Sequence, residues 1–258
     1  MIADNLAHAN ILVLDLETIY SADDCFVCHG SQDDHAPTAP GNQSPHAWTP
    51  IGWDRKADLG ISIGCYWDYD DMALHWFDHT TVEATVSMCV RRRPLLVSFN
   101  GITFDFPLMR ALLHARSSIA LEQLCASFKA QCSESYDVLQ VIWNTYPAWR
   151  RGKGVCSLDA LCAANALPRK TMQGSTAPRR WREGRYADVI AYNVADVLAT
   201  RALFERMVTA DGLFIANADG RPMWRGLPAP SYLHAYLAAK QLNATIRGKE
   251  PTDALCSE

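Results

Sequence analysis

The stretch that most constrains the fold is residues 11–18, Ile-Leu-Val-Leu-Asp-Leu-Glu-Thr. Its unbroken run of four apolar residues predicts a strand buried on both faces, in the middle of a sheet. Because side chains alternate along a strand, Asp15 and Glu17 share one face, whereas Leu14 and Leu16 share the other. Two ionised carboxylates at the end of a buried strand are unfavourable unless a positive charge compensates them. The stretch therefore predicts a metal ion beside Asp15 and Glu17.

Length, charge and cysteine usage narrow the class of protein. The chain has 258 residues, enough for one large α/β domain or two small ones. Its net charge of −4 and its pI of about 6.1 argue against purely electrostatic binding of nucleic acid. We find no signal-peptide pattern, and no apolar run approaches the ~20 residues of a membrane span. The nine cysteines, an odd number, predict reduced thiols and a cytoplasmic location.

The spacing of apolar residues predicts an α/β fold with a mixed sheet. An antiparallel hairpin followed by alternating strands and helices is typical of a sheet with helices on both faces. We expect strands at 10–16, 59–67, 72–78 and 95–99, with a short strand or extended segment at 136–143. The expected helices cover 80–91, 105–116, 119–130, 157–166 and 186–209. The apolar stripe expected on the last of them is Ile190, Val194, Val197, Leu198, Phe204 and Val208.

The domain prediction is one unit at 1–210 that carries a C-terminal extension at 211–258, packed on the same domain. In the extension, Ser231 is expected to cap a last helix that runs to about residue 243, and the final fifteen residues are expected to be disordered. Within the domain, residues 20–58 form an irregular insertion, and residues 168–182 form a basic loop.

The insertion raises the question of zinc. Cys25 and Cys28, together with two of His29, His35 and His46, have the right ligand types for a zinc site. A single Cys-x-x-Cys with irregular histidine spacing is weak support for such a site. The sequence favours a loop with free cysteines, with zinc as the alternative.

Further carboxylates lie downstream of the first pair. Asp105 stands at an expected helix start after the turn at Gly101, and Asp196 follows Tyr192 by four residues on one helical face. Four carboxylates can hold two divalent cations, which can activate water and stabilise the leaving oxygen of a phosphodiester. Ligands that offer only oxygen favour Mg²⁺ or Mn²⁺ over zinc.

Three motifs in order carry a resemblance to a known family: Asp15-Leu-Glu17-Thr18, Asn100-Gly-Ile-Thr-Phe104-Asp105 and Tyr192-xxx-Asp196. They resemble the exonuclease motifs of the DEDD superfamily, and the tyrosine is typical of its DEDDy branch. Ser157-Leu-Asp-Ala-Leu161 and Trp181-Arg-Glu-Gly-Arg-Tyr186 are similar to stand-alone nucleases related to the proofreading domain of family B DNA polymerases. The resemblance covers about residues 10–208 and excludes the insertion and the extension. It implies an RNase H-like fold and 3′→5′ hydrolysis that releases nucleoside monophosphates.

The resemblance also implies roles for single residues. Asp15, Glu17 and Asp196 are expected to bind two Mg²⁺ or Mn²⁺ ions, and Asp105 to bind directly or through water. Because an unperturbed tyrosine has a pKa near 10, we expect Tyr192 to orient the attacking water more than to take its proton. The residues expected to contact the 3′-terminal nucleotide are Thr18, Asn100 and Phe104.

The expected substrate is the 3′ end of single-stranded DNA, with RNA or very short oligonucleotides as the alternative. A non-catalytic nucleic-acid-binding subunit that kept the fold is the rival from another class. In the basic loop, Lys170 and Trp181 are candidates to touch nucleic acid. Proofreading would need a polymerase on a partner chain. Of the spare carboxylates, we expect Asp137 to be structural and Asp159 to be a first-turn helix acid.

Overall fold

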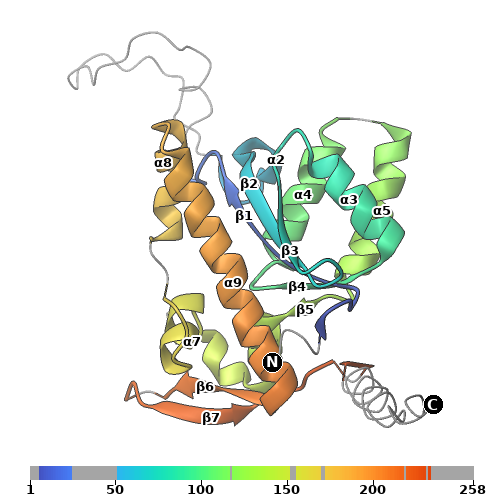
Figure 1. Cartoon of the computed structure of the whole chain (residues 1–258). Coiled ribbons are helices and arrows are strands. Elements are labelled where there is room, and N and C mark those ends of the chain that lie inside the picture. Colours follow the sequence, from blue (N-terminus) through green and yellow to red (C-terminus); the bar gives the residue numbers. More distant parts are fainter. Residues whose placement is uncertain are drawn as a thin grey trace, which may run out of the picture.

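The computed structural model describes residues 6–24, 51–116, 118–151, 155–169, 172–217, 219–230 and 232–233 (Figure 1). A five-stranded mixed sheet lies at its centre, in the order β3-β2-β1-β4-β5. The central strand β1 pairs antiparallel with β2 and parallel with β4; β2 pairs antiparallel with β3, and β4 pairs parallel with β5. The strand bounds are β1 Ile11–Thr18, β2 Ile61–Asp68, β3 Ala73–Phe77, β4 Leu95–Ser98 and β5 Tyr136–Asp137.

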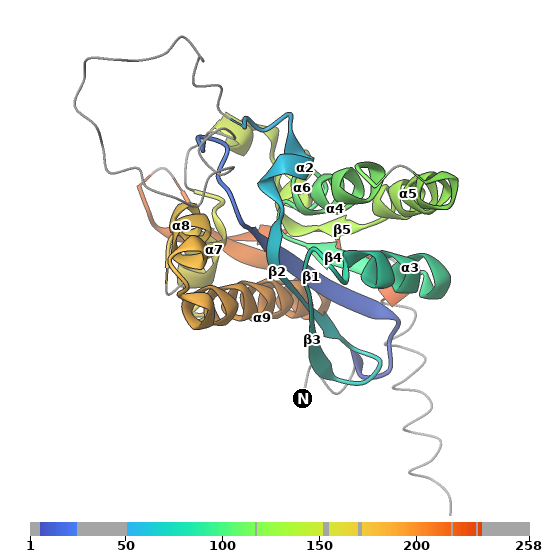
Figure 2. The ribbon, with the colours of Figure 1, turned by 90° about the horizontal axis from the view of Figure 1, so that it is seen from above.

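Eight α-helices flank the sheet in the described part of the chain. Helices α7, α8 and α9 lie on one side of the sheet, and α2, α4 and α5 lie on the other (Figure 2). Two short 3₁₀ helices cover Pro147–Arg151 and Gly174–Thr176. The α-helices are α2 Lys56–Leu59, α3 Val82–Arg92, α4 Asp105–His114, α5 Ile119–Cys132, α6 Val138–Thr145, α7 Leu158–Ala164, α8 Ala177–Arg182 and α9 Tyr186–Ala210.

Two hydrophobic cores, one on each face of the sheet, follow from the alternation of β1. Ile11 and Val13 belong to the core that contains the apolar face of α9. Leu12, Leu14 and Leu16 belong to the core formed with α3, α4 and α5. Since side chains alternate, Asp15 and Glu17 continue the row of Ile11 and Val13. Both carboxylates therefore project towards α9.

This architecture confirms the predicted α/β fold with an RNase H-like mixed sheet. The expected strands at 10–16, 59–67, 72–78 and 95–99 correspond to β1, β2, β3 and β4, with ends that differ by at most two residues. Ser157 accepts a hydrogen bond from the backbone N–H of Ala160 and caps α7 as expected. None of the helices among the described residues is both long and apolar enough to cross a membrane.

The extended segment expected at 136–143 is wrong beyond its second residue. Only Tyr136 and Asp137 form a strand, and helix α6 starts at Val138. The reason is a cap, because the Asp137 carboxylate accepts hydrogen bonds from the backbone N–H groups of Leu139 and Gln140. The capped helix then buries Val138, Leu139 and Ile142, which outweighs the strand preference of this apolar run.

The basic loop expected at 168–182 is also partly wrong. Gly174–Thr176 is a 3₁₀ helix, and Ala177–Arg182 is helix α8. Pro178 stands in the first turn of α8, where its missing N–H has no helical partner to lose. Ala177 and Pro178 are both buried. Lys170 lies outside the described residues.

The apolar stripe expected on α9 fails at Leu198, which is 41% exposed. The buried face instead includes four polar side chains, Tyr192, Asn193, Asp196 and Thr200. The spacing of apolar residues alone does not predict the buried face of a helix that directs polar side chains towards the sheet. Its buried polar residues mark the part of α9 that faces the carboxylates of β1.

After α9 the chain forms an antiparallel hairpin that was not anticipated. Strand β6 (Gly212–Ala216) pairs with β7 (Pro222–Gly226) in a separate two-stranded sheet. Leu213 and Ile215 are fully buried in the core that includes the α9 face. The division at residue 210 stays a prediction. Of the helix expected from Ser231, Tyr232 and Leu233 are described and helical. The rest of that helix and the disordered tail lie outside the described residues.

Gly64 on β2 provides a stability prediction, because an added Cβ would lie 2.2 Å from Cζ of Phe77 on β3. Phe77 is buried, so its ring cannot move away freely. Gly64→Ala should lower the free energy of unfolding by about 1–3 kcal/mol through overpacking. Urea denaturation measures the change in the free energy of unfolding. The matched control is Gly226→Ala on β7, where the nearest atom to an added Cβ is 3.8 Å away. Equal effects of the two substitutions would contradict the overpacking argument.

Candidate active site

A cleft of about 420 Å³ lies at the C-terminal end of β1. Parallel strands of an open α/β sheet commonly present their ligand sites at this end. The residues predicted for catalysis, for metal binding and for contact with the 3′-terminal nucleotide all line the cleft. Of the two candidates in the basic loop, Trp181 does not line it, and Lys170 is outside the described residues. We call this cavity the carboxylate cleft; the predicted residues on its walls are Asp15, Glu17, Thr18, Asn100, Phe104, Asp105, Tyr192 and Asp196.

Three of its carboxylates converge. Asp15, Glu17 and Asp196 each offer an oxygen, and these oxygens lie within 4.8 Å of one another. Asp196 is buried, and the other two are half-buried. Like charges this close repel strongly where water is scarce, so a cation between them is favoured. The all-oxygen donor set fits Mg²⁺ or Mn²⁺.

Local structure explains how β1 and α9 supply these groups. Alternation puts Asp15 and Glu17 on the face towards α9, and the i,i+4 spacing puts Tyr192 and Asp196 on one side of that helix. Asn193 adds a direct tie, because its Nδ2 donates to Oδ2 of Asp15 over 2.7 Å. Asn193 is completely buried, and the sequence reasoning missed it. A polar residue among apolar neighbours in the middle of a long helix was the available signal.

Asp105 enters the cleft from the start of α4. The pairing of β1 with β4 extends only to Val13, so the next residues of β1 have a free edge on that side. Oδ1 of Asp105 accepts the backbone N–H of Leu16 over 3.2 Å on this stretch. Burial raises the pKa of Asp105 to about 7, and the charges of Asp137 and Asp196 add to the effect. A cation in the cleft would favour its ionised form.

Asp137 holds the loop that delivers Asp105. Its carboxylate accepts the backbone N–H groups of Asn100 over 2.9 Å and of Ile102 over 3.1 Å, in addition to capping α6. The residue is 1% exposed, and burial raises its pKa. The structural role expected for Asp137 is confirmed. Its position before α6 and under the loop makes it a connection between two elements of the cleft.

Tyr192 stands beside Asp196 in a buried position, 1% exposed. Burial raises its pKa, and so do the negative charges of Asp196 and Glu17 and a hydrogen bond to the Asp196 side chain. The hydroxyl therefore stays protonated and acts as a donor. Packing against Ala177 and Val189 fixes the ring. Gly174 borders the hydroxyl closely, since a Cβ added there would lie 3.1 Å from it.

The arginines near the cleft have acidic partners. Arg182 forms an ion pair with Asp24 over 2.8 Å and donates to the carbonyl of Ile19. Arg180 pairs with Asp188 over 3.3 Å. These pairs fasten α8 to the segment after β1 and to α9. Trp181 packs against the buried cluster that contains Tyr192. Contact of this region with nucleic acid stays a prediction.

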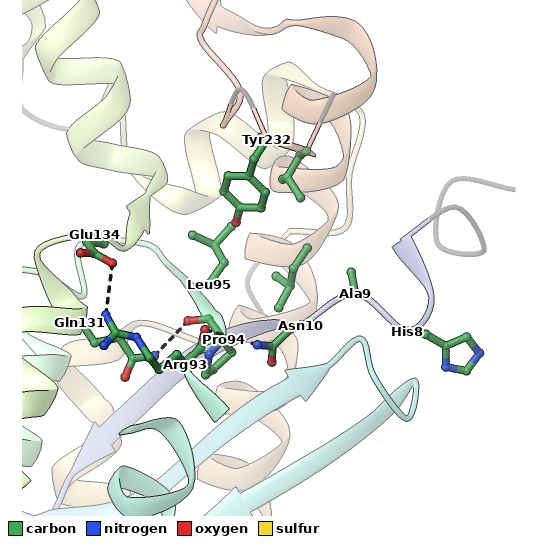
Figure 3. Close-up of a pocket in the computed structure, with 11 residues that line it drawn as sticks. His8, Ala9, Asn10, Arg93, Pro94, Leu95, Gln131, Glu134 and Tyr232 are labelled. Atoms are coloured by element: carbon green, nitrogen blue, oxygen red, sulfur yellow. Dashed lines mark hydrogen bonds and ion pairs between the residues drawn. The ribbon is translucent and has the colours of Figure 1, made fainter. Parts of the chain in front are cut away.

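A larger cavity, of about 650 Å³, lies at the opposite end of β1 (Figure 3). Among the described residues that line it, Glu134 is the one carboxylate, and it faces Arg93 at 3.7 Å. The side chain of Gln131 donates to the carbonyl of Pro94. This cavity lacks the converging oxygens of the carboxylate cleft, so size alone does not identify the candidate site.

A family model described as a predicted 3′-5′ exonuclease related to the exonuclease domain of PolB matches residues 67–219, which is more than half of the chain. The chain belongs to this exonuclease family. The match confirms the relationship that the three motifs suggested. The comparison with curated proteins gave no match.

The match to the exonuclease family covers part of the cleft. It contains Asn100, Phe104, Asp105, Tyr192 and Asp196, whereas Asp15 and Glu17 precede it. The structure brings the two parts together, because β1 pairs with β4 and packs beside α9, and both of these elements lie inside the matched range. The carboxylate cleft is therefore built jointly by the matched region and the strand before it.

Proposed function

We propose that the protein is a metal-dependent exonuclease that removes nucleoside 5′-monophosphates from the 3′ end of single-stranded DNA. The observation that carries the proposal is the convergence of Asp15, Glu17 and Asp196 beside Tyr192, in a chain of the exonuclease family. A nucleic-acid substrate is expected for a member of this family. DNA as the substrate and two metal ions as the cofactor are the proposed details.

In this proposal, Asp15, Glu17 and Asp196 hold Mg²⁺ or Mn²⁺, and Asp105 assists directly or through water. When bound, the cations lower the pKa of water and stabilise the leaving oxygen. Tyr192 orients the attacking water through its hydroxyl oxygen and does not take the proton, because its raised pKa makes it a poor base. Asn193 keeps the Asp15 carboxylate in place through its hydrogen bond.

The remaining walls of the cleft would receive the substrate. Thr18, Asn100 and Phe104 are proposed to contact the 3′-terminal nucleotide. A second cavity of about 760 Å³ shares four lining residues with the cleft. The joined surface supports a substrate longer than one nucleotide. The shared residues are Phe99, Asn100, Gly174 and Ser175.

A 5′-labelled oligonucleotide tests the proposal. With Mg²⁺ or Mn²⁺ the label should move stepwise to shorter products, and a chelator should stop the reaction. Because a ligand that binds only the folded state stabilises it, metal at 100 times its Kd should add about 2.7 kcal/mol to the unfolding free energy. Thermal denaturation with and without metal measures this change. The stabilisation should disappear in Asp15→Asn.

The matched control is an RNA strand of the same sequence. Faster RNA degradation would reverse the proposed substrate preference and keep the chemistry. Binding of single strands without turnover under either metal would instead support a non-catalytic binding subunit. Full activity in the presence of excess chelator would exclude the proposed role of the carboxylates. A cytoplasmic location stays a prediction, and proofreading would need a polymerase on a partner chain.

A further inference from the structure

Trp53 is an exposed aromatic side chain on the wall of the carboxylate cleft. It is 60% exposed, and it lines the same cavity as the carboxylates. Exposed tryptophans are common at binding sites, because a large apolar ring gains more from contact with a partner than from contact with water. Trp76 on β3 is 63% exposed but does not line this cleft. Location, and not exposure alone, therefore distinguishes Trp53.

The backbone holds Trp53 at this position. Ile51 is buried, and its N–H donates to the carbonyl of Asp24 over 2.9 Å. The N–H of Gly52 donates to the carbonyl of Ala22 over 2.8 Å, and its φ of +71° suits glycine. Nζ of Lys56 donates to the carbonyl of Trp53 over 2.9 Å. The chain on both sides of the indole is thus attached to the protein.

The indole meets a second ring. Its centroid lies 5.7 Å from that of Phe104, and the two ring planes make an angle of 74°. Phe104 directly precedes Asp105, which is buried in the cleft. A planar group can stack on one of these rings while its edge meets the other. The cleft therefore joins an aromatic corner to a group of carboxylates that suits cations, and cations held there would attract a phosphate.

We propose that Trp53 and Phe104 form a subsite for the base of the 3′-terminal nucleotide, with Trp53 as the stacking residue. This inference rests on the proposed nuclease function. A nucleotide is the ligand class that combines a flat aromatic part with a phosphate, which a bound cation would attract. Because every base has an aromatic face, stacking tolerates all four bases. The subsite gives the end of the 20–58 insertion a part in substrate binding.

The test combines protein and substrate changes. The variants are Trp53→Ala, Trp53→Phe and, as the matched control, Trp76→Ala. Each is assayed for binding and for hydrolysis of oligonucleotides with a normal 3′ end or with a 3′-terminal abasic nucleotide. An abasic site at the fifth position from the 3′ end is the substrate control. Trp53→Ala should lower kcat/KM on the normal end about 5- to 150-fold, mainly through KM.

The loss should shrink to less than about twofold on the abasic end, where no base is present to stack. Trp53→Phe should recover most of the affinity, and Trp76→Ala should match the parent protein on every substrate. An equal loss on normal and abasic ends would overturn the subsite, because Trp53 would then act on the fold. An unchanged kcat/KM in Trp53→Ala would overturn it as well.

Failure of the proposed function gives a different pattern. If the parent protein binds strands without hydrolysing them, the proposed function fails, and the Kd values decide the subsite. A base-dependent loss of binding in Trp53→Ala then supports the subsite, and a base-independent one overturns it. If the parent protein neither binds nor hydrolyses any oligonucleotide, both are overturned.

Discussion

Asp196→Asn is expected to lower exonuclease turnover by at least about 1,000-fold while leaving the protein folded. The carboxylate lies with Asp15 and Glu17 around one point of the cleft, and asparagine removes a charged metal ligand. Loss of several kcal/mol of transition-state stabilisation, at 1.36 kcal/mol per factor of ten, corresponds to such a change. Single-turnover hydrolysis of a labelled oligonucleotide measures the rate.

The same variant should be as stable as the parent protein, or more stable, when no metal is present. The charge of Asp196 raises the pKa of both Asp105 and Tyr192, so its removal relieves repulsion in a buried place. Urea denaturation in a chelator measures the change. The matched control is Asp188→Asn in the first turn of the same helix, where the carboxylate pairs with Arg180 and Arg185. A catalytic loss of similar size in Asp188→Asn, or an unfolded Asp196→Asn protein, would contradict the assignment.

Asp137→Ala should lower the free energy of unfolding by about 3–5 kcal/mol, which is more than we expect for Gly64→Ala. Four backbone N–H groups, of Asn100, Ile102, Leu139 and Gln140, donate to this one carboxylate. Without it they are left without a side-chain acceptor in a place that is 1% exposed. A buried unsatisfied donor costs about 1–3 kcal/mol. Urea denaturation measures the loss.

Activity should fall as well, because the loop that Asp137 holds leads into Asp105. A displacement of about 1 Å at a catalytic group can lower the rate about 100-fold. Asp137→Asn is the second variant. Oδ1 accepts three of the four hydrogen bonds, and an amide oxygen can keep them. Since burial raises the pKa of Asp137, loss of its charge is itself tolerated. Asp137→Asn should therefore lose less than half as much stability as Asp137→Ala. An equal loss in the two variants would refute the stabilising role of the side-chain oxygen as a hydrogen-bond acceptor.

Features that depend on residues close together in the sequence were predicted, whereas contacts between residues far apart in the sequence were not. Patterns with a short period were predicted correctly: the apolar run of β1, the alternation that pairs Asp15 with Glu17, and the cap of Ser157 on α7. Helix α6 shows the limit of such patterns. The residues from Tyr136 to Trp143 suit a strand, and one side chain, Asp137, changes the outcome by capping a helix.

Contacts between residues far apart in the sequence could be identified only from the tertiary structure. Asn193 donates to Asp15 across 178 positions of sequence, and Leu16 donates to Asp105 across 89. Trp53 meets Phe104 because the segment around residue 51 returns to pair with Ala22 and Asp24. The local spacing of residues does not predict these contacts, since they depend on how the helices and strands pack.

The sequence by itself predicted the class of fold, the family relationship, and the four carboxylates with Tyr192 as candidate site residues. The shared faces of Asp15 with Glu17 and of Tyr192 with Asp196 could be predicted because alternation along a strand and the turn of a helix are geometric constants of the backbone. The family relationship came from the resemblance of the three motifs. The tertiary structure decided which side chains surround those groups: Asn193 bonded to Asp15, Asp137 bonded to the loop before Asp105, and Trp53 on the wall of the cleft. It alone also revealed the hairpin of β6 and β7, whose strands gain their stability from packing and not from local preference.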